Sequence, residues 1–178
     1  MAVVGIVDYA SYVPSYRLRR DLIAEQWRSK PVGGRKAVSN FDQDSLTLAY
    51  EAAWQVVERD PDWRAIDGLF FASTTSPHWQ RASSSFIAAA CDLDEEVETM
   101  DVGGSLRCGT TALRAALHSV HSGSSHRVIV TAADTRDGAP ESLEEQLFGD
   151  AATAVAVGKE DVRAELMMQT SRADNFLD

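Results

Sequence analysis

Strand-like and helix-like segments alternate along this chain of 178 residues. Short runs rich in β-branched and aromatic residues are typical of strands, and apolar residues spaced three or four apart are typical of one helix face. Strands are predicted over residues 3–13, 66–74, 97–102, 127–133, 151–157 and 162–168. Helices are predicted over 16–27, 83–91 and 110–120 and between Asp42 and Pro61, with a polar loop over 29–38.

This alternation predicts an α/β fold of βαβαβαββ type, in which helices cover the faces of a mixed sheet. The last two predicted strands are joined by the short turn 158–161, so they are expected to pair antiparallel. Asp42 and Asp44 stand where carboxylates cap the first N–H groups of a helix. The length suits one domain over residues 1–178 with a substantial core.

The composition is that of an ordinary globular protein, with 44% apolar and 25% charged residues. No apolar run approaches the ~18 residues of a membrane-spanning helix. The first residues show no signal-peptide pattern. Cys91 and Cys108 are too few for a disulfide framework, which favours a reduced, cytoplasmic setting.

The charge is unevenly distributed. The chain carries a net charge of −10, which argues against general nucleic-acid binding. Residues 1–40 nevertheless hold seven basic and three acidic residues, so this segment is +4 and the remainder is −14. A solvated basic surface and a local phosphate-binding patch both explain that segment.

A Gly-rich turn leads from a predicted strand into a helix over residues 101–111 (DVGGSLRCGTT). The N–H groups and the dipole at a helix N-terminus favour negative charge, so a cysteine there would be activated as a thiolate. Leu106 stands where that cysteine is expected, and Cys108 follows two residues later. Ser105 is best interpreted as a helix cap.

Five segments resemble the N-terminal half of thiolase-superfamily condensing enzymes, above all those of the hydroxymethylglutaryl-CoA synthase-like branch, with ketoacyl-ACP synthase III as a more distant cousin. They are residues 5–18 (GIVDYASYVPSYRL), 41–49 (FDQDSLTLA), 102–113 (VGGSLRCGTTAL), 128–135 (VIVTAADT) and 146–158 (QLFGDAATAVAVG). The resemblance covers essentially the whole chain but only the first half of a typical member. It implies a thiolase-like half without the family's C-terminal half.

The resemblance further implies acyl-CoA or acyl-carrier-protein thioesters as ligands. It implies carbon–carbon bond chemistry through an acyl-cysteine, with coenzyme A as part of the substrate and no covalently bound cofactor. The family's nucleophile lies four residues before the threonine that matches Thr110, where this chain has Leu106. Thr74 stands where the synthase branch has an acid/base glutamate, and the family's His and Asn belong to the second half.

Two functions therefore stay open. The first is an acyl-CoA condensing or acyl-transfer enzyme with atypical chemistry. The second is a catalytically silent subunit of a homo- or hetero-oligomer that supports an active thiolase-like partner, a complementary thiolase half or a zinc-ribbon/OB-fold protein. A chain that is one fragment of a longer enzyme is a third reading.

Cys108 is the candidate for a relocated nucleophile, although two residues rotate it by ~200° about the helix axis. A small buried packing residue is the alternative interpretation. Trp27, Arg28 and Arg35 resemble in placement the adenine-stacking Trp and phosphate-binding Arg of ketoacyl-ACP synthase III, so they are candidates for binding coenzyme A.

Other polar residues receive structural or open interpretations. His118, His121 and His126 lack spaced partners, so no metal site is predicted. His78 could enter a substrate channel or lie on the surface. Asp134 and Arg136 are expected to form an ion pair, and Asp150 is expected to fix a turn.

Overall fold

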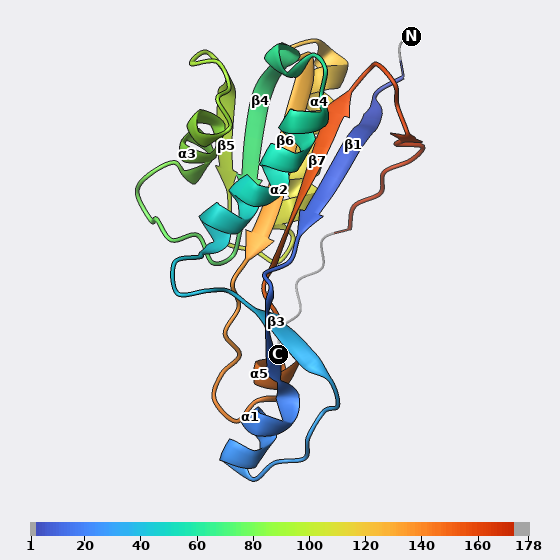
Figure 1. Ribbon diagram of the computed structural model, residues 1–178. Helices are drawn as coiled ribbons and strands as arrows, with labels where there is room; N and C mark the ends of the chain where they lie inside the picture. The colour runs from blue at the N-terminus through green and yellow to red at the C-terminus, as the bar shows by residue number, and fades with distance from the viewer. Residues whose placement is uncertain (1–2, 173–178) are drawn as a thin grey trace.

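The computed structural model describes residues 3–172. A six-stranded mixed sheet forms its body, with the strand order β5-β4-β6-β7-β1-β8. β4, β5 and β6 are parallel, whereas β7 runs antiparallel to both β6 and β1 (Figure 1). The strands are β1 (Gly5–Tyr12), β4 (Ile66–Ala72), β5 (Glu98–Val102), β6 (Arg127–Asp134), β7 (Ala151–Gly158) and β8 (Ala164–Glu165). The predicted α/β class with a mixed sheet is confirmed.

Helices cover both faces of this sheet. α2 (Ser45–Arg59) and α3 (Ser83–Ala90) pack on one face, and α4 (Cys108–Ser122) packs on the other (Figure 1). Side chains alternate along a strand, so Phe71 joins the α2 cluster and Phe70 joins the α4 cluster. Each ring is 1% exposed, and its burial stabilises the fold by about 1.5–3 kcal/mol.

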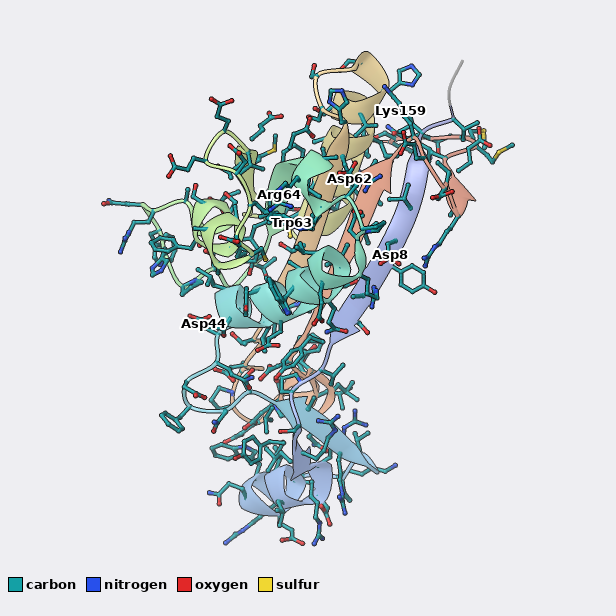
Figure 2. All side chains as sticks on the ribbon, turned by 45° about the horizontal axis from the view of Figure 1, so that its top comes forward. Asp8, Asp44, Asp62, Trp63, Arg64 and Lys159 are labelled. Atoms are coloured by element: carbon teal, nitrogen blue, oxygen red, sulfur yellow. The ribbon has the colours of Figure 1, made fainter. Side chains whose placement is uncertain are left out.

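The start of α2 is fixed by a reciprocal cap, as its acidic start predicted. The Asp44 carboxylate accepts a hydrogen bond from Thr47 N at 2.8 Å, and Thr47 Oγ1 accepts one from Asp44 N at 2.7 Å. Asp44 therefore sets where the helix begins (Figure 2). The buried stripe of this helix includes the predicted Ala49, Ala52 and Val56.

Two segments far apart in sequence form an arm beyond one end of the sheet (Figure 1). The arm consists of β2 (Tyr16–Arg19), α1 (Arg20–Trp27), β3 (Arg35–Val38) and α5 (Leu143–Leu147). The helix predicted over 16–27 was therefore wrong in its first four residues, and the end of the loop predicted over 29–38 is a strand. Pairing between residues 16–19 and 35–38 is non-local, and it overrides the local pattern.

The last strand also differs from its prediction. β8 is only two residues long, and it pairs with β1 rather than with β7. Gly5 permits this contact, because a Cβ placed there would lie 2.2 Å from the Ala164 carbonyl oxygen. The turn after β7 thus carries the chain to the far edge of β1 instead of closing a hairpin.

Candidate functional site

The carboxyl ends of the three parallel strands meet at the end of the sheet that faces the arm (Figure 1). Loops that leave parallel strands at such an edge commonly form ligand sites. Here the loop after β4 carries Thr74, the turn after β5 carries Leu106, and the segment after β6 carries Arg136. The topology thereby brings together the two positions at which the chain departs from the family pattern.

Asp134 fastens these strand ends together. Its Oδ1 accepts hydrogen bonds from Ser73 Oγ at 3.0 Å, Thr74 N at 2.7 Å and Thr75 Oγ1 at 3.1 Å. Thr75 Oγ1 also accepts a hydrogen bond from Thr135 N at 3.0 Å. The 73–75 loop is therefore held against the end of β6 by a charge-assisted network.

Replacing Asp134 with alanine is expected to lower the free energy of unfolding by about 2–3 kcal/mol, because three donors lose a charged acceptor at once. Urea unfolding would measure the loss. Asp137→Ala is the matched control, since Asp137 is a nearby exposed carboxylate. A loss no larger than that of the control would mean that water replaces the Asp134 contacts without cost.

A hollow of about 410 Å³, here called the α4 hollow, lies before the start of α4. Its walls are residues 74–75, 104–106 and 136–137. The Leu106 side chain is 73% exposed and contributes to this wall. A second hollow of about 600 Å³ shares Thr74 and Gly104 with the first, and His78 and Trp79 line it. His78 is partly exposed and lines this open hollow, a position that both the channel and the surface interpretation allow.

Cys108 faces the opposite way from Leu106. It is the first residue of α4, it is 7% exposed, and it packs in the apolar cluster with Phe70 and Ala112. Burial raises the pKa of the Cys108 thiol and outweighs the lowering caused by the backbone N–H of the next residue, while the Asp134 carboxylate adds a smaller rise. This placement favours the neutral thiol over the thiolate that a nucleophile needs.

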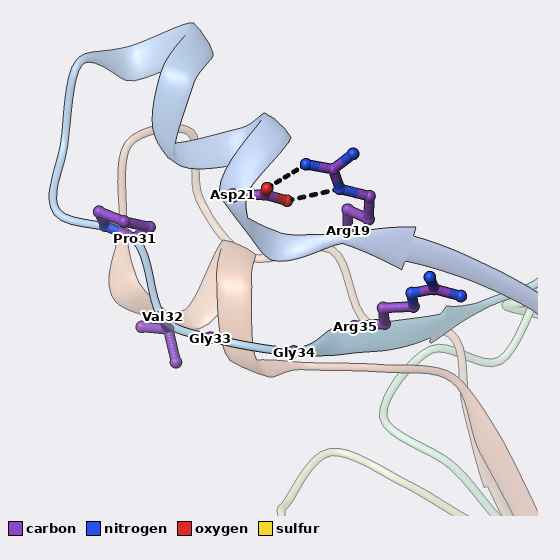
Figure 3. A pocket seen from close by; sticks show the side chains of 7 residues that line it. All are labelled: Arg19, Asp21, Pro31, Val32, Gly33, Gly34 and Arg35. Atoms are coloured by element: carbon purple, nitrogen blue, oxygen red, sulfur yellow. Dashed lines mark hydrogen bonds and ion pairs between the residues drawn. The ribbon is translucent and has the colours of Figure 1, made fainter.

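The arm carries a pair of guanidinium groups directly opposite each other. Arg19 in β2 and Arg35 in β3 are cross-strand partners, and both border a hollow of about 520 Å³, here called the arm hollow (Figure 3). Its remaining walls are Asp21 and residues 31–34. Like charges placed opposite each other destabilise a strand pair, so this arrangement is unusual unless an anion joins them.

Only one of the two guanidinium groups is neutralised by a carboxylate. Arg19 donates to Asp21 through two nitrogens, including Nε at 3.0 Å from Oδ1 (Figure 3). Arg35 has no ion-pair partner within residues 3–172, which leaves its charge toward the hollow. Trp27 ends α1 and Arg28 follows it in a left-handed conformation, and neither lines the arm hollow. The structure thus groups Arg35 with Arg19 rather than with Trp27 and Arg28.

Arg136 connects the α4 hollow with the arm. Its guanidinium carbon lies 4.6 Å from the centre of the Phe148 ring, which directly follows α5, while the residue also lines the α4 hollow. The predicted ion pair between Asp134 and Arg136 is therefore absent from the described residues, because Asp134 turns toward the 73–75 loop. Arg19 and Arg136 were missed as site residues; only the excess of basic residues before position 40 hinted at Arg19.

The remaining predicted polar residues have structural surroundings. Asp150 Oδ2 accepts a hydrogen bond from Ser39 N at 2.7 Å, which fits its predicted role in a turn. The His126 ring lies 3.2 Å from Asp67, whereas His118 and His121 border a separate groove beside β8. Among residues 3–172 no cluster of ligands could hold a metal ion, and none of the helices there is long and apolar enough to cross a membrane.

Two curated proteins that are similar to this chain share one name, hydroxymethylglutaryl-CoA synthase. No family model matches the chain. It is 30% identical over 174 residues to the hydroxymethylglutaryl-CoA synthase of Pyrobaculum neutrophilum, a match that covers 93% of this chain and 50% of the relative. It is 34% identical over 162 residues to that of Pyrococcus furiosus, covering 89% and 46%. The chain thus spans about half the length of the curated relatives it matches.

Solved structures share the fold. A 3-oxoacyl-(acyl-carrier-protein) synthase III superposes with a TM-score of 0.80 at 20% identity, over 92% of this chain and 52% of that one. The hydroxymethylglutaryl synthase of the curacin biosynthetic pathway, solved with acetyl donor acyl-carrier protein, superposes with a TM-score of 0.78 at 20% identity, over 89% and 42%. The chain is thus similar in sequence to about half the length of hydroxymethylglutaryl-CoA synthases, and it shares the fold of these two solved synthases.

Proposed function

We propose that this chain binds acyl thioesters of coenzyme A or acyl-carrier protein and takes part in carbon–carbon bond-forming or bond-breaking acyl chemistry. The observation that carries the proposal is the Arg19–Arg35 pair, which lies at the same end of the sheet as the α4 hollow. The phosphates of coenzyme A or of a phosphopantetheine group suit the Arg35 guanidinium, which can bind phosphate in a planar fork, while Arg19 opposite it is already paired with Asp21. Arg136, between the arm and the α4 hollow, continues the basic path toward Leu106.

In this proposal Leu106 forms an apolar wall for the acyl group and is not itself acylated. The carbonyl of the bound thioester would lie near the first N–H groups of α4, where the helix dipole stabilises negative charge on its oxygen. Thr74, which lines the same hollow as Leu106, offers a hydroxyl in place of a carboxylate. Cys108 stays the candidate for a relocated nucleophile, although its burial among apolar side chains does not favour that role.

The ligand half of the proposal is tested by titrating the protein with coenzyme A in a calorimeter. Arg35→Ala is expected to raise the dissociation constant for coenzyme A about tenfold or more, because a charge-assisted hydrogen bond contributes about 1.5–3 kcal/mol. Added salt should weaken wild-type binding more than binding by the variant. Arg64→Ala is the matched control. The Arg64 guanidinium lies over the Trp63 ring, and both residues are outside the arm (Figure 2). Equal affinities for wild type and Arg35→Ala would contradict the arm site.

A silent subunit is the second candidate function. It is favoured by the exposed Leu106 side chain and by Thr74, since neither supplies a thiolate or a carboxylate. In that case the active site belongs to a partner in a homo- or hetero-oligomer: a complementary thiolase half, an active thiolase-like chain or a zinc-ribbon/OB-fold protein. Native mass spectrometry of the purified protein, combined with an assay of acyl-CoA turnover, distinguishes the two functions. A stable lone monomer that turns over acyl-CoA would exclude the silent role.

A further inference from the structure

We propose that Gln146 is a positioning residue for the arm hollow, whose carboxamide holds the 29–34 loop in the conformation that binds phosphate. The inference rests on the proposed function, because it assigns the arm hollow to the phosphates of coenzyme A. Gln146 lies in α5, more than a hundred residues from that loop in sequence. It is only 4% exposed, so its polar atoms depend on the loop for their hydrogen bonds.

One carboxamide makes three contacts with the loop. Gln146 Oε1 accepts a hydrogen bond from Val32 N at 2.8 Å. Its Nε2 donates to the Lys30 carbonyl oxygen at 3.4 Å and lies 3.5 Å from Ser29 Oγ. An amide side chain suits this place because it carries an acceptor and two donors on one planar group. The 29–34 loop is therefore held in place by hydrogen bonds to a buried side chain of α5.

The fastened loop forms the wall of the arm hollow. Residues 31–34 line it, and the chain enters β3 at Arg35 immediately afterwards. The neighbouring residue of α5 helps, because the Glu145 carbonyl accepts a hydrogen bond from Lys36 Nζ at 2.9 Å. α5 thus braces both the loop and the strand that present the Arg35 guanidinium to the hollow.

The consequence for binding is entropic. A loop already ordered in the free protein loses little freedom when a ligand binds, whereas a loosened loop must be ordered at that moment. Removal of the Gln146 carboxamide keeps the Arg19 and Arg35 side chains but releases the loop that forms the rest of the hollow's wall. We therefore expect weaker binding of coenzyme A without loss of the ionic contacts.

The test compares Gln146→Ala with Gln43→Ala. Gln43 is a matched control, because its Oε1 accepts from Asn40 N at 3.0 Å and its Nε2 donates to Tyr12 Oη at 2.8 Å, outside the arm hollow. With coenzyme A as the probe, Gln146→Ala should raise the dissociation constant about five- to tenfold, whereas Gln43→Ala should raise it less than twofold. The salt dependence of binding should stay that of wild type in Gln146→Ala, whereas Arg35→Ala should flatten it.

Hydrogen exchange gives a readout that does not depend on the ligand. The backbone amides of residues 29–30 and 32–34 should exchange faster in Gln146→Ala than in wild type, and saturating coenzyme A should restore their protection. If Gln146→Ala and Gln43→Ala bind coenzyme A equally well, the positioning role is wrong while the arm site stands. If wild type does not bind coenzyme A, the proposed function fails and the positioning role falls with it.

Discussion

Replacing Leu106 with cysteine is expected to create a thiol that acetyl-CoA acylates. Leu106 is 73% exposed in the wall of the α4 hollow, two residues before the first residue of α4. At a helix N-terminus the thiol pKa falls from about 8.5 into a range of about 3.5–7.5, so much more thiolate is present at pH 7. The thiolate attacks the thioester carbonyl, the new S–C bond replaces that to coenzyme A, and coenzyme A leaves as a thiol after taking up a proton.

Intact-mass measurement after exposure to acetyl-CoA checks this result. Leu106→Cys should gain an acetyl increment, and iodoacetamide should alkylate it about tenfold faster at pH 7 than His121→Cys. His121 is exposed in the last turn of the same helix, where the dipole has the opposite sign. Equal alkylation rates would mean that the start of α4 does not activate a thiol.

The same experiment decides the status of Cys108. Wild type and Cys108→Ala are both expected to remain unmodified, because the Cys108 thiol is buried and its pKa is raised by that burial. An acyl increment on wild type that disappears in Cys108→Ala would instead identify Cys108 as a relocated nucleophile. It would also require α4 to open toward the hollow.

The sheet and its covering helices were predictable because their signals are local. The stripe of Ala49, Ala52 and Val56 predicted α2, and the apolar run at 127–133 predicted β6. The β2–β3 pair and the partner of β8 were not predictable in the same way. Both pairings depend on which distant strand supplies the hydrogen bonds. The sequence of a short polar segment does not indicate its partner strand.

The candidate site divides along the same line. The turn before α4 could be located because a Gly-rich segment between a strand and a helix is a local pattern. Asp134 lies two residues before Arg136 in sequence but accepts hydrogen bonds from Ser73 and Thr75, because parallel strands bring their carboxyl ends together. Gln146 and the 29–34 loop are likewise joined only by the folded arm. Sequence patterns therefore find the elements of this site better than the contacts between them.

Replacing Arg127 with alanine is expected to lower the free energy of unfolding by about 3–5 kcal/mol, because it leaves a buried carboxylate without its charge partner. Arg127 Nη1 lies 2.7 Å and 2.6 Å from the two carboxylate oxygens of Asp60, and the side chains are only 14% and 9% exposed. Asp60 follows the end of α2 and Arg127 begins β6, so the pair joins a helix to the central sheet. Urea unfolding at pH 7 would measure the loss.

Arg59→Ala separates burial from charge in this prediction. Arg59 also pairs with an aspartate, Asp8, at 2.8 Å, but its side chain is 48% exposed, so its loss should cost no more than about 1 kcal/mol. The double variant Arg127→Met with Asp60→Leu should recover much of the stability lost in Arg127→Ala, since two apolar side chains need no charge partner. Equal losses for Arg127→Ala and Arg59→Ala would show that water reaches Asp60. The contact between α2 and β6 would then depend on the apolar stripe of the helix alone, which already packs against Ile129 in the same cluster.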